Sequence, residues 1–305
     1  MTILLFLIGL AALFVGGDLL LRGAVSTARS LRVSDLVIGM TVIGFGTSLP
    51  ELLVSVQAAW TGAPGIALGN VIGSNIANIL LILGAAALLF PVAAQFVNIR
   101  RDLLMMLAAT VALWLLIADG RLGRAEGTVL VIGLAAFLWF SLRQSDPLPA
   151  SAPADPARFK FQSAAQLGVG LALLIIGARL LVDSATTLAR DAGISEAVVG
   201  LTIVAIGTSL PELATSLMAA WRRNASVALG NVIGSNLFNI LGIMGLTAVI
   251  APVTAQARFA TLDMPIALAT AGILVLLLWR SQGIGRVGGA MLFGGYLFYL
   301  IAIGA

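Results

Sequence analysis

Two glutamates stand in the middle of long apolar segments, and the same five residues precede each of them. The hexapeptide GTSLPE occupies residues 46–51 and recurs at residues 207–212, so the two acids are Glu51 and Glu212. A carboxylate in such surroundings costs at least a few kcal/mol unless it is paired or functional. The proline inside each hexapeptide frees carbonyl groups of the preceding turn, which must then face protein, a cavity or a ligand.

Further oxygen-bearing side chains follow each glutamate at helical spacing. The first set is Thr47, Ser48, Glu51 and Ser55, and one segment later Asn70, Ser74 and Asn78. The second set is Thr208, Ser209, Glu212 and Ser216, and then Asn231, Ser235 and Asn239. Steps of three, four and seven put each set on one helix face. Hydroxyl, amide and carboxylate oxygens are hard donors that suit Na⁺, Ca²⁺ or Mg²⁺.

A structural interpretation competes with this one for several polar residues. A hydroxyl in a membrane helix commonly bonds a carbonyl one turn back, and the glycines are typical packing devices. Both interpretations, cation ligand and hydrogen bond between helices, stay open for Asn70, Asn75, Asn231 and Asn236. The glutamates are different, because a buried unpaired acid has no comparable structural use.

Composition places these residues in a lipid bilayer. The chain is 60% hydrophobic and 10% charged, and its mean hydropathy is +1.09. Cys and His are absent, which excludes disulfides, thiolate metal sites and imidazole catalysis. The net charge of +4 indicates topology signals rather than nucleic-acid binding in such a chain. We interpret residues 1–21 as a first membrane helix rather than a signal peptide, because no cleavage site follows.

Apolar runs of membrane-spanning length predict an all-α polytopic membrane protein with ten transmembrane helices. They lie near residues 2–21, 35–60, 65–90, 102–118, 125–142, 162–182, 197–221, 225–250, 262–279 and 286–304. We expect a first five-helix repeat at residues 1–143, a linker rich in Pro, Ala and Asp at 144–161, and a second five-helix repeat at 162–305.

An internal repeat relates the two halves. Residues 39–84 align with residues 200–245 at a constant offset of 161, with 27 identities in 46 positions. Because five is odd, the second copy enters the membrane from the opposite side. Two inverted-topology five-helix repeats are typical of secondary transporters whose binding site lies at the midplane.

The distribution of basic residues predicts the orientation. If the N-terminus is outside, the inner loops hold 12 of the 17 basic residues and the outer loops hold five. The positive-inside rule then places both termini outside the cytoplasm, with the chain in the cell (inner) membrane.

At these motifs the chain resembles the cation/Ca²⁺ exchanger superfamily, and within it the prokaryotic Na⁺/Ca²⁺ exchangers. Their two repeats carry GTSLPE followed by GN-x-x-GSN, as at residues 69–75 and 230–236 here. The resemblance implies an antiporter that exchanges Na⁺ for Ca²⁺ by alternating access. It also implies two short gating helices, the first and the sixth, that slide over a core of eight, and four cation sites between the second, third, seventh and eighth helices.

The resemblance also implies a role for each motif position. Glu51 and Glu212 are the carboxylate ligands shared by Ca²⁺ and Na⁺. Carbonyl ligands are Thr47 and Thr208 for Ca²⁺, and Gly44 and Ala205 for peripheral Na⁺; hydroxyl ligands are Ser48, Ser74, Ser209 and Ser235. Asn78 and Asn239 occupy central positions, and Pro50 and Pro211 are hinges. Relatives often have Asp at the position of Asn239, so this centre has two acids rather than three.

Charge counting gives a mechanistic expectation. Two carboxylates neutralise one Ca²⁺, whereas the three Na⁺ that the resemblance implies leave one positive charge, so exchange is expected to be electrogenic. No cofactor, nucleic acid or obligate protein partner is expected; Na⁺, Ca²⁺ and the lipid bilayer are the partners. Alternatives are a Ca²⁺/H⁺ or K⁺-dependent exchanger of the same superfamily and an ion channel. A membrane-embedded aspartyl protease is disfavoured because the aspartates lie near segment ends.

Overall fold

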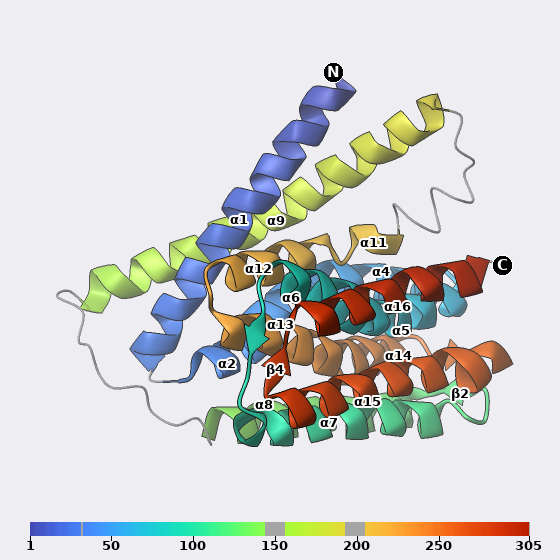
Figure 1. Ribbon diagram of the computed structural model, residues 1–305. Helices are drawn as coiled ribbons and strands as arrows, with labels where there is room; N and C mark the ends of the chain where they lie inside the picture. Colours follow the sequence, from blue (N-terminus) through green and yellow to red (C-terminus); the bar gives the residue numbers. More distant parts are fainter. Residues whose placement is uncertain (32, 144–155, 193–204, 305) are drawn as a thin grey trace.

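The computed structural model describes residues 1–31, 33–143, 156–192 and 205–304, and it is almost entirely helical (Figure 1). In this part of the chain, six helices are long and apolar enough to cross a membrane. There are seven if the bent pair Asp35–Thr47 and Leu49–Trp60 counts as one span. The expected all-helical membrane fold is therefore confirmed.

The elements follow one another in a repeated order, in which η marks π-helical segments. The first half contains α1 (Thr2–Leu31), α2 (Asp35–Ile38), η1 (Gly39–Ile43), α3 (Gly44–Thr47), α4 (Leu49–Trp60), α5 (Pro64–Ala77), η2 (Asn78–Leu83), α6 (Gly84–Leu89), β1 (Val92–Ala93), α7 (Phe96–Leu116), β2 (Arg121–Leu122) and α8 (Arg124–Arg143). The second half contains α9 (Pro156–Asp191), α11 (Ala205–Gly207), α12 (Leu210–Trp221), α13 (Ala225–Leu237), η4 (Phe238–Met244), α14 (Gly245–Ile250), β3 (Val253–Thr254), η5 (Phe259–Asp263), α15 (Met264–Ser281), β4 (Gly283–Ile284) and α16 (Arg286–Gly304).

The expected linker and the expected seventh span fall partly outside the described residues. Residues 144–155 of the expected linker lie outside the described residues, and α9 already begins at Pro156. Residues 197–204 of the expected seventh span also lie outside them.

Helices α1 and α9 cross each other on one side of the remaining helices (Figure 1). They contain 30 and 36 residues, so the expectation that the first and sixth helices are short is wrong. Both continue past the apolar runs expected at residues 2–21 and 162–182, to Leu31 and Asp191. Small residues allow the crossing, since a Cβ on Gly16 would lie 2.9 Å from the carbonyl oxygen of Gly170.

Both hexapeptides interrupt a helix, as their prolines predict. α4 begins one residue after Ser48, where the backbone leaves helical geometry at φ −85° and ψ 8°, and its axis departs by 46° from that of residues 35–47. α12 begins in the same way after Ser209, at φ −87° and ψ 7°. In each case the proline stands in the first turn of the new helix, where its missing N–H costs nothing.

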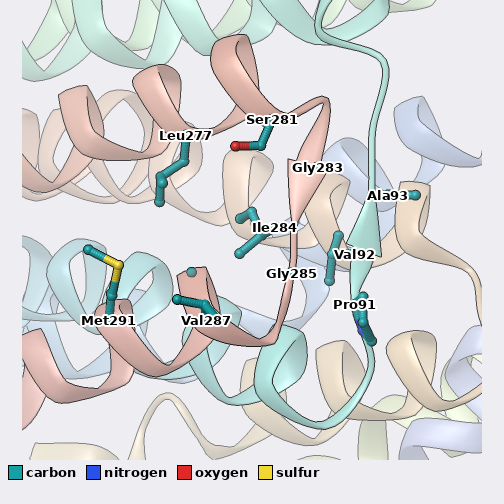
Figure 2. A pocket seen from close by; sticks show the side chains of 11 residues that line it. Pro91, Val92, Ala93, Leu277, Ser281, Gly283, Ile284, Gly285, Val287 and Met291 are labelled. Carbon is teal, nitrogen blue, oxygen red and sulfur yellow. The ribbon is translucent and has the colours of Figure 1, made fainter.

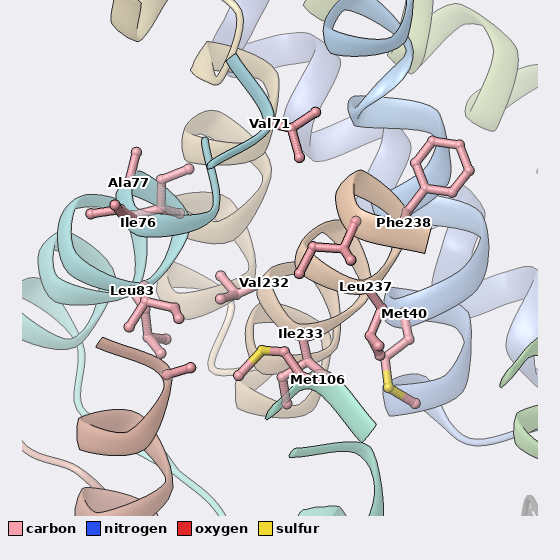
Figure 3. Close-up of a cluster of buried hydrophobic side chains, with 14 of the residues drawn as sticks. Met40, Val71, Ile76, Ala77, Leu83, Met106, Val232, Ile233, Leu237 and Phe238 are labelled. Carbon is pink, nitrogen blue, oxygen red and sulfur yellow. The ribbon is translucent and has the colours of Figure 1, made fainter. Parts of the chain in front are cut away.

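The core is formed by the continuous helices α5–η2–α6 and α13–η4–α14. In each, 83% of the apolar window is buried, compared with 28% for α1. Figure 3 shows their side chains packed together with residues from η1 and α7, among them Val71, Ile76, Leu83, Val232, Ile233, Leu237, Met40 and Met106. Helices that are apolar on all sides are buried by their neighbours. The polar candidate ligands on these two helices therefore lie in the interior of the protein.

Two short antiparallel ribbons close the bundle. β1 pairs with β4 through Val92 and Ile284, and β2 pairs with β3 through Leu122 and Val253. The 21 residues of α7 separate them by about 30 Å, so the ribbons lie at opposite ends (Figure 1). A cavity of about 540 Å³ beside the β1–β4 ribbon is lined mainly by apolar residues and by none of the candidate ligands (Figure 2).

Candidate functional site

The serine at each helix break forms a hydrogen bond with the glutamate of the other half. Ser48 Oγ donates to Glu212 Oε1 at 2.8 Å, and Ser209 Oγ donates to Glu51 Oε1 at 3.2 Å. Both glutamates are 1% exposed. The two copies of the hexapeptide therefore meet at one place, where each contributes a serine to the carboxylate of the other.

Two asparagines tie the broken helices to the core. Asn70 Nδ2 donates to the carbonyl of Glu51 at 3.1 Å and to Ser55 Oγ at 2.9 Å. Asn231 Nδ2 makes the same pair of bonds, to the carbonyl of Glu212 at 3.3 Å and to Ser216 Oγ at 2.9 Å. The amides satisfy backbone groups at the start of α4 and α12. Their hydrogen bonds support the structural interpretation that the sequence left open.

A second set of amides joins the two core helices. Asn78 Nδ2 donates to Asn236 Oδ1, and Asn239 Nδ2 donates to Asn75 Oδ1, both at 2.9 Å. Because these hydrogen bonds fix the NH₂ groups of Asn78 and Asn239, the side-chain Oδ1 atoms of both residues point away from the bonded asparagines. Asn75 and Asn236 are thus hydrogen-bonded between helices.

Four buried oxygens at this centre have no hydrogen-bond partner among the described residues. They are Glu51 Oε2, Glu212 Oε2, Asn78 Oδ1 and Asn239 Oδ1. An unpartnered buried acceptor is costly, so four in symmetry-related positions require an explanation. Two carboxylate and two amide oxygens form a hard donor set with two negative charges, which fits a bound Ca²⁺ or Na⁺.

The remaining candidates surround this centre. Ser74 Oγ lies 3.4 Å from Ser209 Oγ, and Ser235 Oγ donates to the carbonyl of Gly44 at 3.4 Å. Thr47 Oγ1 donates back to the carbonyl of Ile43 at 3.0 Å and lies 3.4 Å from Asn231 Oδ1 in the other half.

Two candidates lie at the border of the described chain. Thr208 lies in the turn between α11 and α12 and lines a cavity together with Ser74. Ala205 is the first residue of α11 and borders the undescribed residues 193–204.

The sequence pattern of the family described as sodium/calcium exchanger protein matches residues 1–143 and 162–304. The chain belongs to the sodium/calcium exchanger family. This exchanger is 40% identical over 304 residues to the putative antiporter CaxA of Alkalimonas amylolytica, covering 96% of this chain and 95% of the relative. It is 38% identical over 307 residues to the inner membrane protein YrbG of Escherichia coli, covering 97% and 94%.

A solved structure has the same fold along the whole exchanger. The sodium–calcium exchanger NCX_Mj, soaked with zero Na⁺ and Ca²⁺, superimposes with a TM-score of 0.87 at 34% identity, covering 99% of this chain and 98% of that chain. Since these relatives are membrane proteins and transporters, the exchanger is a multi-pass membrane transporter and not an enzyme.

Proposed function

We propose that the chain exchanges Na⁺ for Ca²⁺ across the membrane at one site to which both halves contribute. The observation that carries the proposal is the set of four unpartnered oxygens on Glu51, Glu212, Asn78 and Asn239. Solved structures of the relative NCX_Mj were obtained after soaking with Na⁺ and Ca²⁺, and that chain is 35% identical over its matched length. The donor chemistry here and the ions used there agree.

The ligand roles follow from the same centre. Glu51 and Glu212 bind Ca²⁺ and Na⁺ alternately, with Asn78 and Asn239 beside them. The hydroxyls of Ser48, Ser74, Ser209 and Ser235, and the carbonyls of Thr47, Thr208, Gly44 and Ala205, complete the central and peripheral cation positions. With two carboxylates, one Ca²⁺ is neutralised and three Na⁺ carry one charge in excess, so exchange is electrogenic.

Alternating access by two inverted five-helix repeats explains why the site is doubled. Ten transmembrane helices place one hexapeptide break in each repeat, and Pro50 and Pro211 are the hinges. The 46° bend at the first break and the crossing of α1 and α9 outside the core support this division into moving and fixed helices. Both termini then lie outside the cytoplasm, by the count of basic residues.

Radioactive Ca²⁺ uptake into proteoliposomes tests the proposal. Vesicles are loaded with Na⁺, diluted into ⁴⁵Ca²⁺, and compared with vesicles loaded with choline. We expect uptake that requires internal Na⁺ and that speeds up when a K⁺ diffusion potential makes the interior positive. Uptake driven by a proton gradient without Na⁺, uptake that requires external K⁺ alongside Ca²⁺, or uncoupled flux would replace the proposal with a Ca²⁺/H⁺ exchanger, a K⁺-dependent exchanger or a channel.

A further inference from the structure

The internal repeat extends beyond the candidate site to a second pair of acids. Pro91, Val92, Ala94 and Gln95 recur as Pro252, Val253, Ala255 and Gln256, and seven residues after each glutamine stands Asp102 or Asp263, all at the offset of 161. Both aspartates are buried, with exposures of 2% and 6%. Neither belongs to the hexapeptide site, and a buried acid within an apolar helix indicates a function.

Asp263 ends the π-helical segment η5 and stands at the start of α15 without capping it. π-helical segments are rare and occur frequently at functional sites. The other described ones, η1, η2 and η4, directly precede or contain the candidate ligands Gly44, Asn78 and Asn239. Asp263 therefore occupies the same kind of local structure as residues of the cation site.

The described partner of Asp263 holds it weakly. Arg258 Nε lies 3.4 Å from Asp263 Oδ2, and the arginine side chain is 53% exposed whereas that of the aspartate is 9% exposed. An ion pair with one member mostly in water contributes little. The guanidinium can move into solvent, while the carboxylate stays fixed.

A cavity of about 500 Å³ connects this acid with the candidate site. Its lining includes Gln256, Arg258 and Asp263 from the η5 region, and Asn70, Ser74 and Thr208 from the site. The Asp263 carboxyl group and Ser74 therefore border the same cavity.

Asp102 has the corresponding place at the other end of the protein. It lines a cavity of about 610 Å³ together with Gln95, Arg101 and Ser226, and Arg101 Nη2 donates to it at 2.7 Å. Gln95 follows β1 and Gln256 follows β3, and these strands belong to the two ribbons at opposite ends of α7 (Figure 1). None of the lining residues described for this second cavity is a candidate ligand, so in this structure the path from the Asp102 end stops short of the site.

Resting on the proposed exchange of cations, we infer that Asp263 and Asp102 are entrance carboxylates, one for each membrane face. Each concentrates the transported cation in the cavity at its own face, and in this structure the Asp263 cavity is the one that reaches candidate ligands. A charge inside a low-dielectric cavity acts strongly on local ion concentration. At the Asp263 face, Arg258 is the mobile counter-charge that an arriving cation displaces.

Rates of ⁴⁵Ca²⁺ and ²²Na⁺ uptake in right-side-out and inside-out membrane vesicles test this role. If Asp263→Asn changes the cavity potential by one kT, local Na⁺ falls about threefold and Ca²⁺, with twice the charge, about sevenfold. We therefore expect the half-saturating concentrations to rise by these factors when the cation is added at the Asp263 face. Values at the opposite face and the maximal rate stay unchanged. Asp102→Asn has the same effect at the other face, and added choline chloride reduces both effects by screening.

Three further variants serve as controls for the Asp263→Asn measurement. Asp119→Asn removes the same charge from an exposed turn beside the β2–β3 ribbon, at the end where Gln256 lies, and leaves both half-saturating concentrations unchanged. Asp263→Glu keeps the wild-type values. Arg258→Gln, which also serves if Asp263→Asn does not fold, lowers the Ca²⁺ value at the Asp263 face.

Two outcomes overturn the inference. One is a shift that is equal at the two faces or equal for the two ions, and the other is an unchanged value after Asp263→Asn or Arg258→Gln. A wild-type protein without Na⁺-driven Ca²⁺ flux refutes the proposed function instead, so the two failures are distinguishable.

Discussion

Asn75 and Asn236 bind each other across the centre of the protein. Asn75 Nδ2 donates to the carbonyl of Asn236 at 3.2 Å, and Asn236 Nδ2 donates to the carbonyl of Asn75 at 3.3 Å. Their side-chain oxygens in turn accept from Asn239 and Asn78. One reciprocal pair thus orients both central amides and leaves the oxygens of Asn78 and Asn239 without another partner in the described chain.

The first prediction concerns Asn239, which cannot ionise. In the wild type, only Glu51 and Glu212 titrate at the centre, whereas Asn239→Asp adds a third carboxyl group that loses a proton as the pH rises. Protonation removes one negative charge, so we expect exchange by Asn239→Asp to fall more steeply on acidification than exchange by the wild type. The measurement is Na⁺-driven ⁴⁵Ca²⁺ uptake as a function of pH.

Asn78→Asp is the matched variant in the other half, because Asn78 donates to Asn236 as Asn239 donates to Asn75. Each variant also leaves one asparagine oxygen without its donor, at a cost of about 1–3 kcal/mol, so a lower thermal unfolding temperature is expected in both. An unchanged pH profile in Asn239→Asp would show that this side chain lies outside the transport site.

Much of the centre could be predicted from the sequence because its parts are coded locally. Proline in each hexapeptide dictates a break, and the helices do restart after Ser48 and Ser209. The amides of Asn70 and Asn231 could not be assigned in advance. Their role depends on how α4 packs on α5 and α12 on α13, which spacing along one helix does not reveal.

The positions of helix ends outside the apolar runs could not be predicted from the sequence either. Apolar runs end the first segment near residue 21, yet α1 continues to Leu31 as charged helix. Asp18 forms ion pairs with Arg22, at 2.7 Å, and with Arg222 at the end of α12, so charged side chains near the end of the apolar run stabilise the continuing helix. Hydropathy predicts which residues lie in the bilayer, whereas the length of a helix also depends on side-chain contacts of this kind.

The second prediction is topological. Twelve basic residues against five predict that the C-terminus after α16 lies outside the cytoplasm. A fused reporter that is active only in the cytoplasm should stay silent, and one that matures only in the periplasm should be active. A bright cytoplasmic reporter contradicts the orientation without affecting the proposed site.

The third prediction compares two glycines at equivalent positions of the repeat. A Cβ on Gly234 would collide with the backbone of Met40, whereas a Cβ on Gly73 would meet nothing described within 4 Å. We expect Gly234→Ala to lose about 1–3 kcal/mol of stability, because backbone atoms cannot yield as a side chain does. Gly73→Ala should be as stable as the wild type or more so, since alanine favours the helix.

Thermal unfolding of the purified proteins in detergent measures this difference directly. Equal unfolding temperatures for the two variants would show that the close approach of α13 to η1 is not required for stability. A loss confined to Gly73→Ala would contradict the packing itself.

The last prediction asks whether Glu51 and Glu212 act on one ion. Glu51→Gln and Glu212→Gln keep the side-chain size and most of the hydrogen bonding, including acceptance from Ser209 and Ser48, but each removes one negative charge. Two unit charges 4 Å apart interact by about 4 kcal/mol at an effective dielectric constant of 20, and a divalent ion interacts by about twice as much, so losing one carboxylate weakens Ca²⁺ binding by more than about 10³-fold. Either single variant should therefore abolish Ca²⁺ exchange, and the double variant should be no worse than either one. Acids in independent sites would instead give partial, additive losses. Substantial Na⁺-driven Ca²⁺ flux in either single variant excludes a shared site and leaves the doubled hexapeptide as a packing device.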